Sequence, residues 1–167
     1  MTAESKRRCP RDVRLVCFDV DGVFTDGRFY LSDDGVETKA FCTQDGYGVR
    51  QLVRAGINVA VISGRQSVAA ERRMAELGVG HVILGCKDKV AAFDDVVTKL
   101  GISVRQTVCV GDDMPDLQLL QRAAFAVAVA NAVPAVKQAC DIITNAAGGF
   151  GAVREVCELV LAAVDHA

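Results

Sequence analysis

Two groups of closely spaced carboxylates stand directly after short apolar runs. Asp19 and Asp21 follow Leu-Val-Cys-Phe, and the second group, Asp112, Asp113 and Asp116, follows Thr-Val-Cys-Val. An unpaired buried carboxylate is costly, so each group requires a cation or a proton beside it. Three acids within five residues form an oxygen-rich site suited to a hard divalent cation. The alternative is that these acids only close turns or cap the helices that follow.

Two further signals have the residue types that bind phosphate. Ser63-Gly64-Arg65 follows the run Val-Ala-Val-Ile, and Lys87-Asp88-Lys89 stands at a predicted helix start. A hydroxyl and a glycine at a helix start offer donors to a phosphate, although Ser is also a common N-cap. A lysine there opposes the helix dipole and predicts a nearby anion; in isolation the cluster is also compatible with a solvated charged turn.

Alternating short apolar runs and amphipathic stretches must position these residues. The apolar runs cover residues 13–18, 57–62, 81–84, 107–110 and 125–129. Stretches of helical period lie at about 46–55, 66–77, 87–100, 114–123, 134–139 and 149–164. The pattern predicts an α/β fold with a doubly wound, mostly parallel, Rossmann-like sheet. Because parallel strands present their carboxyl ends at one edge, all four signals are expected to meet there.

One insertion interrupts this alternation at about residues 27–41. Asp34-Gly35 between two short alternating segments predicts a β-hairpin. The insertion starts at the carboxyl end of the first strand, beside the predicted site, and it is too small to form a cap domain.

Composition narrows the class of protein. A chain of 167 residues predicts a single domain, and 19 basic against 21 acidic residues show no excess suited to a nucleic-acid partner. No apolar run has the length of a membrane span, so no membrane partner is expected. Seven cysteines without zinc-like spacing predict reduced thiols and a cytoplasmic protein. The basic N-terminus has no apolar signal region, and residues 1–12 are predicted to be a flexible tail.

The order Asp-x-Asp, Ser-Gly, Lys, Gly-Asp-Asp-x-x-Asp resembles the haloacid dehalogenase superfamily over about residues 13–116. The resemblance implies that Asp19 is a nucleophile forming an aspartyl-phosphate. Asp21 would be the general acid and base. The implied phosphate-binding residues are Ser63, Gly64, Lys89 and Gly22.

The same resemblance implies a Mg²⁺ site. Asp19, the backbone carbonyl of Asp21 and Asp112 would be its ligands. Asp113 would bind through water, and Asp116 would support the ligands from outside. A carboxylate that attacks a phosphate dianion meets like-charge repulsion, which a divalent ion and a lysine would neutralise.

Further motifs are similar to the 3-deoxy-D-manno-octulosonate 8-phosphate phosphatase family, over about residues 13–160. They are residues 19–27, Lys39-Ala40-Phe41, Asp45-Gly46-Tyr47-Gly48, Ser63-Gly64-Arg65 and Gly151-Ala152-Val153-Arg154-Glu155. The resemblance implies a capless phosphoric monoester hydrolase that forms homotetramers, with each hairpin reaching a neighbouring site. It also implies a role in making the Kdo sugar of lipopolysaccharide, with Arg65, Asp26 and Thr25 at the substrate.

One departure keeps the substrate open. Phe150 stands where members of this family commonly have Arg. The alternative substrate is the 9-phosphate of a nine-carbon sugar acid, KDN or sialic acid. From other classes, a receiver-like signalling domain and an inactive scaffold are the alternatives; a receiver, however, places its accepting Asp after the third strand, where this chain has Leu84-Gly85-Cys86.

Overall fold

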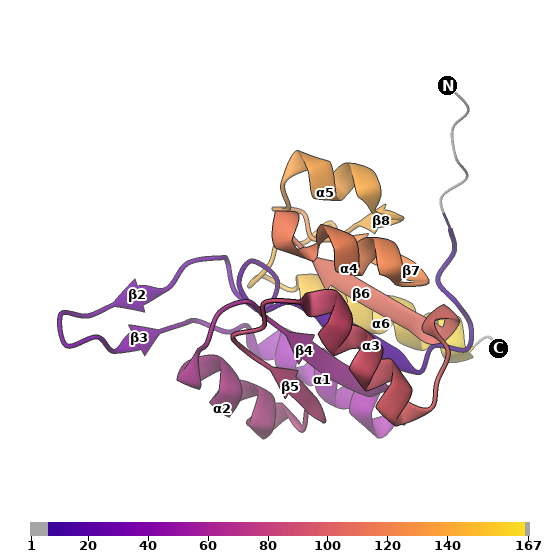
Figure 1. Ribbon diagram of the computed structural model, residues 1–167, viewed down its shortest axis with the longest axis horizontal. Coiled ribbons are helices and arrows are strands. Elements are labelled where there is room, and N and C mark those ends of the chain that lie inside the picture. Colours follow the sequence, from indigo (N-terminus) through magenta and orange to yellow (C-terminus); the bar gives the residue numbers. More distant parts are fainter. Residues whose placement is uncertain (1–6, 166–167) are drawn as a thin grey trace.

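The computed structural model describes residues 7–165, and within them a six-stranded sheet has the order β5-β4-β1-β6-β7-β8 (Figure 1). All neighbouring strands pair in parallel. The strands are β1 (Leu15–Phe18), β4 (Asn58–Ile62), β5 (His81–Ile83), β6 (Thr107–Gly111), β7 (Phe125–Ala128) and β8 (Ile142–Ile143). The chain runs outward from β1 to β4 and β5 and then crosses back to β6. The order therefore reverses beside β1, where open α/β sheets bind ligands.

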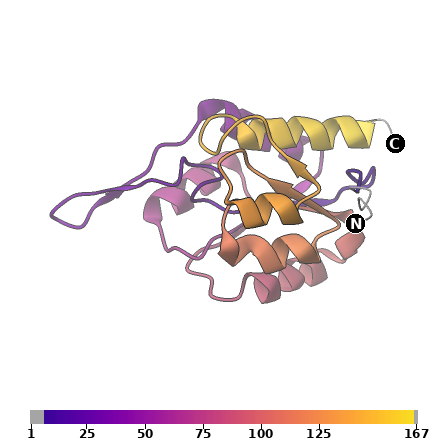
Figure 2. The same ribbon diagram turned by 90° about the horizontal axis from the view of Figure 1, so that it is seen from above.

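Helices cover both faces of the sheet, as the doubly wound prediction requires (Figures 1 and 2). On one face α1 (Thr43–Arg54) lies along α6 (Ala152–Asp165). The other face carries α3 (Lys89–Leu100) and α4 (Leu117–Arg122). Near the two edges lie α2 (Val68–Leu77) and α5 (Pro134–Ala139), and two 3₁₀ turns complete the elements, η1 (Val104–Gln106) and η2 (Met114–Asp116).

The predicted alternation is confirmed, with differences at element ends. The two-residue strand β8 was not predicted, because two residues show no periodicity. The helix predicted from residue 149 begins at Ala152, since Gly149 and Gly151 have φ angles of +76° and +106°. The helix predicted over 114–123 is divided into η2 and α4.

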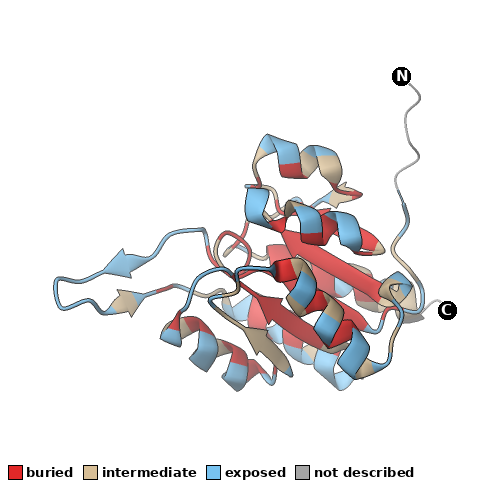
Figure 3. Cartoon of the chain, viewed as in Figure 1, coloured by how far each residue is buried: buried red, intermediate tan, exposed pale blue. Residues whose placement is uncertain are grey.

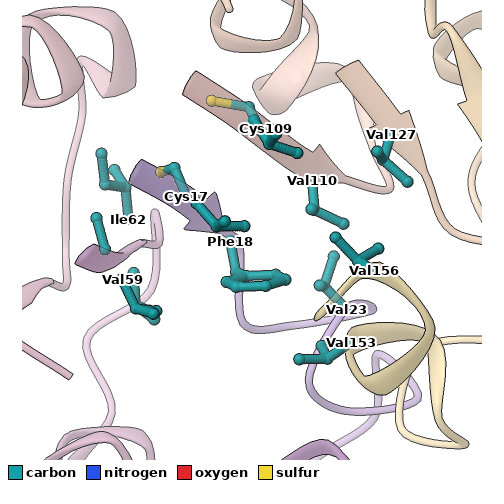
Figure 4. Packing of buried hydrophobic residues seen from close by; sticks show 14 of the residues in the cluster. Cys17, Phe18, Val23, Val59, Ile62, Cys109, Val110, Val127, Val153 and Val156 are labelled. Atoms are coloured by element: carbon teal, nitrogen blue, oxygen red, sulfur yellow. The ribbon is translucent and has the colours of Figure 1, made fainter. Parts of the chain in front are cut away.

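The core forms between the strands and the helices on either face (Figure 3). Phe18 and Phe24 meet edge to face with ring centroids 5.3 Å apart. Figure 4 shows Phe18, Val23 and Val153 packed together beneath the end of β1. Cys17 and Cys109 are buried register partners in β1 and β6, and their thiols are free, as predicted for core cysteines.

The insertion forms a separate two-stranded antiparallel sheet of β2 (Tyr30–Leu31) and β3 (Glu37–Thr38). Gly35 has a φ of +81° at the turn, and its N–H donates to the Ser32 carbonyl at 2.9 Å. The hairpin projects away from the domain and is mostly exposed (Figures 1 and 3). No cap domain is present in the described chain, as predicted.

The predicted flexible tail needs a correction in its described part. Residues 1–6 lie outside the described residues, but Arg7 is held against the domain. Its Nε donates to Asp141 Oδ1 and its Nη1 to the Ala123 carbonyl, each at 2.9 Å. Asp141, a buried acid directly before β8, thus gives Arg7 an ion-pair partner that the sequence pattern did not indicate. Across residues 7–165, no helix has the length and apolar character of a membrane span.

Candidate active site

A hollow opens at the carboxyl ends of β1, β4 and β6, and most of the predicted site residues line it. Asp19 and Asp21 follow β1, Ser63 follows β4, Asp112 follows β6, and Lys89 begins α3. The complete lining is Asp19, Asp21, Gly27, Ser63, Gly64, Arg65, Lys89, Asp112, Asp113, Pro115 and Asp116. The fold therefore brings together four signals that are up to about a hundred residues apart in the sequence.

The loop after β1 is fixed by its own hydrogen bonds. The Val20 carbonyl accepts from the backbone N–H groups of Val23, Phe24 and Thr25. The Thr25 hydroxyl accepts from the N–H groups of Gly22 and Gly27, at 3.3 and 3.2 Å. These bonds hold Asp19 and Asp21 at the mouth of the sheet.

Three predicted residues lie outside the hollow. Thr25 is fully buried beneath the loop, so the expected substrate contact gives way to a structural role. The N–H of Gly22 donates to the Thr25 hydroxyl and does not face the hollow where a phosphate would lie. A Cβ at Gly22 would lie 2.0 Å from Asp112 Oδ2. Asp26 is exposed beside a neighbouring hollow that Phe150 also lines, and its carboxylate accepts from the N–H of Arg28.

Lys89 joins the two carboxylate groups. Its Nζ lies 3.0 Å from Asp19 Oδ1 and 2.6 Å from Asp116 Oδ1, and the side chain is buried. Burial alone lowers the pKa of Lys89, but the charges of Asp19 and Asp116 outweigh it and raise the pKa above its ordinary value. The anion expected beside this lysine is therefore present, and the lysine stays charged. Asp88, the N-cap of α3, accepts from the Ala91 N–H at 2.9 Å and fixes the helix start.

The carboxylates of Asp19, Asp112 and Asp116 place one oxygen each within 4.8 Å of one another. Burial and the charges of neighbouring acids raise the pKa of Asp112 to about 8. Burial and the charge of Asp116, opposed by Lys89, raise that of Asp19 to about 6. Asp112 Oδ1 is buried and has no hydrogen-bond partner among the described residues. Crowded carboxylates that disfavour one another's negative charge, with one unmatched acceptor among them, fit a divalent cation.

The remaining two acids of the second group support this cluster differently. Asp116 Oδ2 accepts from the N–H groups of Asp112 and Asp113, at 3.0 and 3.3 Å, so Asp116 shapes the loop while holding Lys89. The exposed Asp113 accepts from the Met114 N–H at 2.7 Å and caps η2. Capping thus accounts for one contact of Asp113, whereas Asp116 contacts both Lys89 and the backbone of the loop.

A second buried lysine faces the other catalytic candidate. Lys39 follows β3, and its Nζ forms an ion pair with Asp21 Oδ1. The Lys39 side chain is fully buried, whereas Asp21 is partly exposed to the hollow. From the sequence, Lys39 stands out only as part of the motif Lys39-Ala40-Phe41. Its alternation along the hairpin strand was the signal, since it places Lys39 on the same side of that strand as Glu37.

The base of the hairpin also contacts Arg65. Glu37 Oε2 accepts from Arg65 Nε at 2.7 Å, and the Arg65 guanidinium lies 3.8 Å from the centre of the Phe29 ring. Glu37 Oε1 accepts from the Ser67 hydroxyl, the N-cap of α2, at 2.6 Å. Both arms of the hairpin therefore hold Arg65 at the rim.

Asn131 is a positioning residue that the sequence analysis missed. Its Nδ2 donates to the Gly22 carbonyl at 3.0 Å, and its Oδ1 accepts from the Gly148 N–H at 2.6 Å. A Cβ at Gly148 would lie 1.8 Å from the Gly22 carbonyl oxygen, so only glycine permits this approach. A polar residue just after an apolar run was the available signal, the same one that identified Asp19.

Two other resemblance motifs lie away from the hollow and join α1 to α6. Asp45 Oδ1 accepts from the Arg154 N–H at the start of α6, at 2.8 Å. A Cβ at Gly48 would lie 3.1 Å from that of Cys157, so the glycine allows the two helices to pack closely. Glu155 accepts from the N–H groups of Asn145 and Ala146. These motifs stabilise the fold behind the site.

Known proteins share this arrangement over most of the chain. The sequence model of the haloacid dehalogenase-like hydrolase family matches residues 82–155. The 3-deoxy-D-manno-octulosonate 8-phosphate phosphatase KdsC of Salmonella typhi is 43% identical over 152 residues, which cover 91% of this chain and 81% of that protein. The Moraxella catarrhalis phosphatase, solved with magnesium, phosphate and KDO, superposes with a TM-score of 0.91 at 42% identity, covering 93% of this chain and 90% of that one.

A cobalt-bound deoxy-D-mannose-octulosonate 8-phosphate phosphatase from Haemophilus influenzae has a TM-score of 0.89 and 38% identity, covering 93% of this chain and 91% of that one. Identity at this level extends over nearly the whole length of the chain, and the backbones superpose closely. The chain therefore belongs to the 3-deoxy-D-manno-octulosonate 8-phosphate phosphatase family of the haloacid dehalogenase-like hydrolases.

Proposed function

We propose that this protein is a Mg²⁺-dependent phosphatase that hydrolyses 3-deoxy-D-manno-octulosonate 8-phosphate to the free sugar acid and phosphate. The observation that carries the proposal is the arrangement of Asp19, Lys89 and Asp112 around one hollow, in a chain 43% identical to such a phosphatase. Asp19 and Asp112, whose carboxylates lie together with that of Asp116, would hold the ion, and the backbone carbonyl of Asp21 would be a further ligand, as the family resemblance implies. Bound Mg²⁺ would neutralise charge on the phosphoryl oxygens and orient Asp19 toward phosphorus.

The first chemical step transfers the phosphoryl group to the protein. A carboxylate oxygen of Asp19 attacks phosphorus as the bond from phosphorus to the sugar oxygen breaks. The carboxyl group of Asp21 gives its proton to the departing oxygen, and the sugar leaves as an alcohol. Lys89 and the donors of Ser63 and Gly64 stabilise the charge of the transferred group.

The second step releases phosphate. Asp21, now a carboxylate, takes a proton from a water molecule that attacks phosphorus, and the bond to Asp19 breaks. Both protonation states of the starting enzyme are restored, and one acid/base group serves both steps. The side chain of Asp21 is suited to this because it lines the hollow within two residues of the nucleophile.

The substrate test compares steady-state kinetics on four kinds of phosphate ester: KDO 8-phosphate, KDN 9-phosphate, sialic acid 9-phosphate and simple hexose phosphates. We expect the highest kcat/KM for KDO 8-phosphate. A nine-carbon substrate is the second candidate because Phe150, 70% exposed, replaces a commonly found Arg. Higher kcat/KM for a 9-phosphate would overturn the eight-carbon assignment, and turnover of p-nitrophenyl phosphate without any sugar phosphate would overturn both. No turnover of any of these phosphate esters in the presence of Mg²⁺ would favour the alternative that the protein is an inactive scaffold.

We also propose that the protein is a homo-oligomer, a tetramer as in the family resemblance, in which each hairpin reaches a neighbouring site. Tyr30, Leu31 and Val36 are 68%, 63% and 57% exposed on the hairpin. An isolated two-stranded hairpin is at best marginal in water, so these apolar side chains require a covering surface. A second chain would supply it and exclude water from the hollow.

Deleting residues 28–38 is expected to dissociate the assembly and remove activity on the sugar phosphate, while some p-nitrophenyl phosphate turnover survives. A sharper variant is Tyr30→Ser with Leu31→Ser, which spares Phe29, Glu37 and Lys39. The control is Val53→Ser with Val68→Ser, which removes two exposed apolar side chains from α1 and α2 instead of from the hairpin. Light scattering that finds the wild type to be a fully active monomer would contradict the shared site.

The cellular setting proposed is the cytoplasm of a Gram-negative bacterium, where the product would enter lipopolysaccharide synthesis. None of the seven cysteines, all of which lie within residues 7–165, forms a disulfide, which suits a reducing compartment. Fractionation of cells that express the tagged chain would test the location.

A further inference from the structure

Each of the two proposed catalytic carboxylates has its own buried lysine. Lys89 pairs with Asp19 from the sheet side, and Lys39 pairs with Asp21 from the hairpin side. Lys89 also contacts the hollow, where phosphoryl oxygens would lie. Lys39 does not line the hollow, and its side chain is fully buried behind Asp21. Of the side chains that line the hollow, Asp21 is the one with which Lys39 forms an ion pair.

The ion pair fixes one particular oxygen of Asp21. Lys39 Nζ contacts Oδ1, which leaves Oδ2 as the oxygen that can carry a proton toward the hollow. A free carboxyl side chain exchanges its two oxygens by rotation about its last bond, and such a proton donor is out of position part of the time. A cation held at Oδ1 removes that freedom.

Lys39 is itself held by the hairpin strand that carries it. Glu37 Oε1 lies 3.7 Å from Lys39 Nζ and accepts from the Ser67 hydroxyl at 2.6 Å. Glu37 Oε2 pairs with Arg65. The anchor thus runs from α2 through Glu37 and Lys39 to Asp21, without any main-sheet strand. A buried ion pair by itself adds little to folding stability, so this arrangement calls for another explanation.

We propose that Lys39 is a positioning residue that holds the Asp21 carboxyl group for proton transfer to the leaving sugar oxygen. The proposal rests on the phosphatase function proposed above. In the step concerned, the bond from phosphorus to the sugar oxygen breaks, the proton on Asp21 Oδ2 moves to that oxygen, and Lys39 keeps its own protons. Because an alkoxide is a poor leaving group, this transfer matters for a sugar phosphate. A p-nitrophenolate departs without it.

The test is the leaving-group dependence of kcat/KM, which reports the chemistry up to formation of the aspartyl-phosphate. KDO 8-phosphate and p-nitrophenyl phosphate are compared in wild type, Lys39→Met, Lys39→Arg, Asp21→Asn and the control Lys99→Met. Lys99 is an exposed lysine in the last turn of α3, at the opposite end of that helix from Lys89, and it does not line the hollow. We expect Lys39→Met to lower kcat/KM for KDO 8-phosphate by about 10²-fold, within the range of general acid catalysis.

For p-nitrophenyl phosphate, we expect Lys39→Met to lower kcat/KM by less than about threefold, since no proton is required. Asp21→Asn should show the same split more strongly, Lys39→Arg should recover part of the loss, and Lys99→Met should match wild type. An equal loss on both substrates, or no loss on either, would overturn the proposal. Melting temperature and light scattering show whether Lys39→Met folds and assembles as wild type does.

Glu37→Gln provides a second route if Lys39→Met does not fold. It leaves Lys39 in place but removes the charge that anchors it, and we expect a smaller split in the same direction. Equal effects of Glu37→Gln on both substrates would again overturn the proposal. Failure of the proposed function gives a different result, because wild type would then not hydrolyse KDO 8-phosphate; the split can still be measured with any alkyl phosphate that it does hydrolyse.

Discussion

The loop of residues 19–27 and the hairpin of residues 28–38 follow the same strand, yet different forces fix them. Hydrogen bonds to Val20 and Thr25 tie the loop together, and it lies against Asn131 and Gly148. The hairpin has an ordinary turn and antiparallel bonds but leaves large apolar side chains in water (Figure 3). The loop is thus packed against other segments of its own chain, whereas the apolar side chains of the hairpin have no such covering surface within the described residues.

This difference divides the proposed chemistry in two. Phosphoryl transfer depends on Asp19, Lys89 and Asp112, which the sheet and its helices position. Departure of the leaving group depends on Asp21, which the base of the hairpin holds through Lys39. Substitutions that affect only one of the two regions can therefore separate the two functions.

The largest difference is expected between the same substitution in the two regions. Asp19→Asn should lower phosphatase activity by at least about 10³-fold on every substrate, because an amide cannot act as the nucleophile. Asp33→Asn, at the exposed hairpin tip, should leave activity near that of wild type. Near-normal turnover by Asp19→Asn, measured with p-nitrophenyl phosphate, would rule out the aspartyl-phosphate route.

Removal of the metal should also act on the loop side alone. Chelation with EDTA is expected to abolish activity on sugar and aryl phosphates, and added Mg²⁺ to restore it. Ca²⁺ should restore little, since it accepts longer distances and more ligands than the roughly 2.1 Å octahedron of Mg²⁺, and it would misplace Asp19. The proposed assembly through the hairpin, followed by light scattering, should be unchanged by EDTA. Full activity after exhaustive chelation would refute the metal assignment.

The sequence was sufficient to predict the alternating strands and helices and the polar site residues that directly follow strands. Asp19, Ser63 and Asp112 were found because each follows an apolar run, and parallel topology then required them to meet. Lys89 was found from its conflict with a helix dipole, and both anions that resolve the conflict are present.

What the sequence did not predict depends on contacts between distant segments. Thr25 has a hydroxyl group and stands in the motif that follows β1, which suggested contact with the substrate, but tertiary packing buries it beneath the loop. Asn131 and Gly148 act by approaching Gly22 from more than a hundred residues away. The position of Asn131 just after an apolar run marks it as a candidate, but no local pattern specifies which distant segment it contacts. The strand β8 consists of only two residues, which is too short for periodicity to show.

Two glycines with nearly the same backbone angle provide a smaller, more exact comparison. Gly22 and Gly35 have φ angles of +83° and +81°, so alanine costs each site about 1–2 kcal/mol of conformational energy. A Cβ at Gly35 meets no atom within 4 Å, whereas at Gly22 it would lie 2.0 Å from Asp112 Oδ2. That oxygen belongs to a proposed metal ligand.

We expect Gly35→Ala to lower the free energy of unfolding by about 1 kcal/mol without changing activity. Gly22→Ala should lower activity by about 10²-fold or more and weaken Mg²⁺ binding, since Asp112 must move away. Chemical denaturation and Mg²⁺ titration of the two variants measure both effects. Equal activity in the two variants would show that Asp112 is free to shift without consequence.

The last comparison concerns stability as a function of pH in the metal-free protein. The folded-state pKa values of Asp19 and Asp112, about 6 and about 8, both lie above the ordinary 3.8. Between about pH 4 and pH 8 the folded state therefore binds more protons than the unfolded state, and linkage makes the free energy of unfolding fall as pH rises. Below pH 4 both states are protonated at these two groups, and their contribution no longer changes.

Mg²⁺ should oppose this loss, because it binds the ionised carboxylates of the folded protein. At a concentration of about 100 times its dissociation constant, it would add about 2.7 kcal/mol, or roughly 5–10 °C in Tm for a domain of this size. The gain in Tm over EDTA should therefore grow from pH 5 to pH 8, where Asp112 gives up its proton most readily. Asp112→Asn removes the group with the higher pKa, so its Tm in EDTA should depend less on pH and respond less to Mg²⁺. A Tm in EDTA that rises from pH 5 to pH 8 would contradict the proposed crowding of charge. It would show that ionisation of Asp19 and Asp112 does not lower the stability of the folded protein.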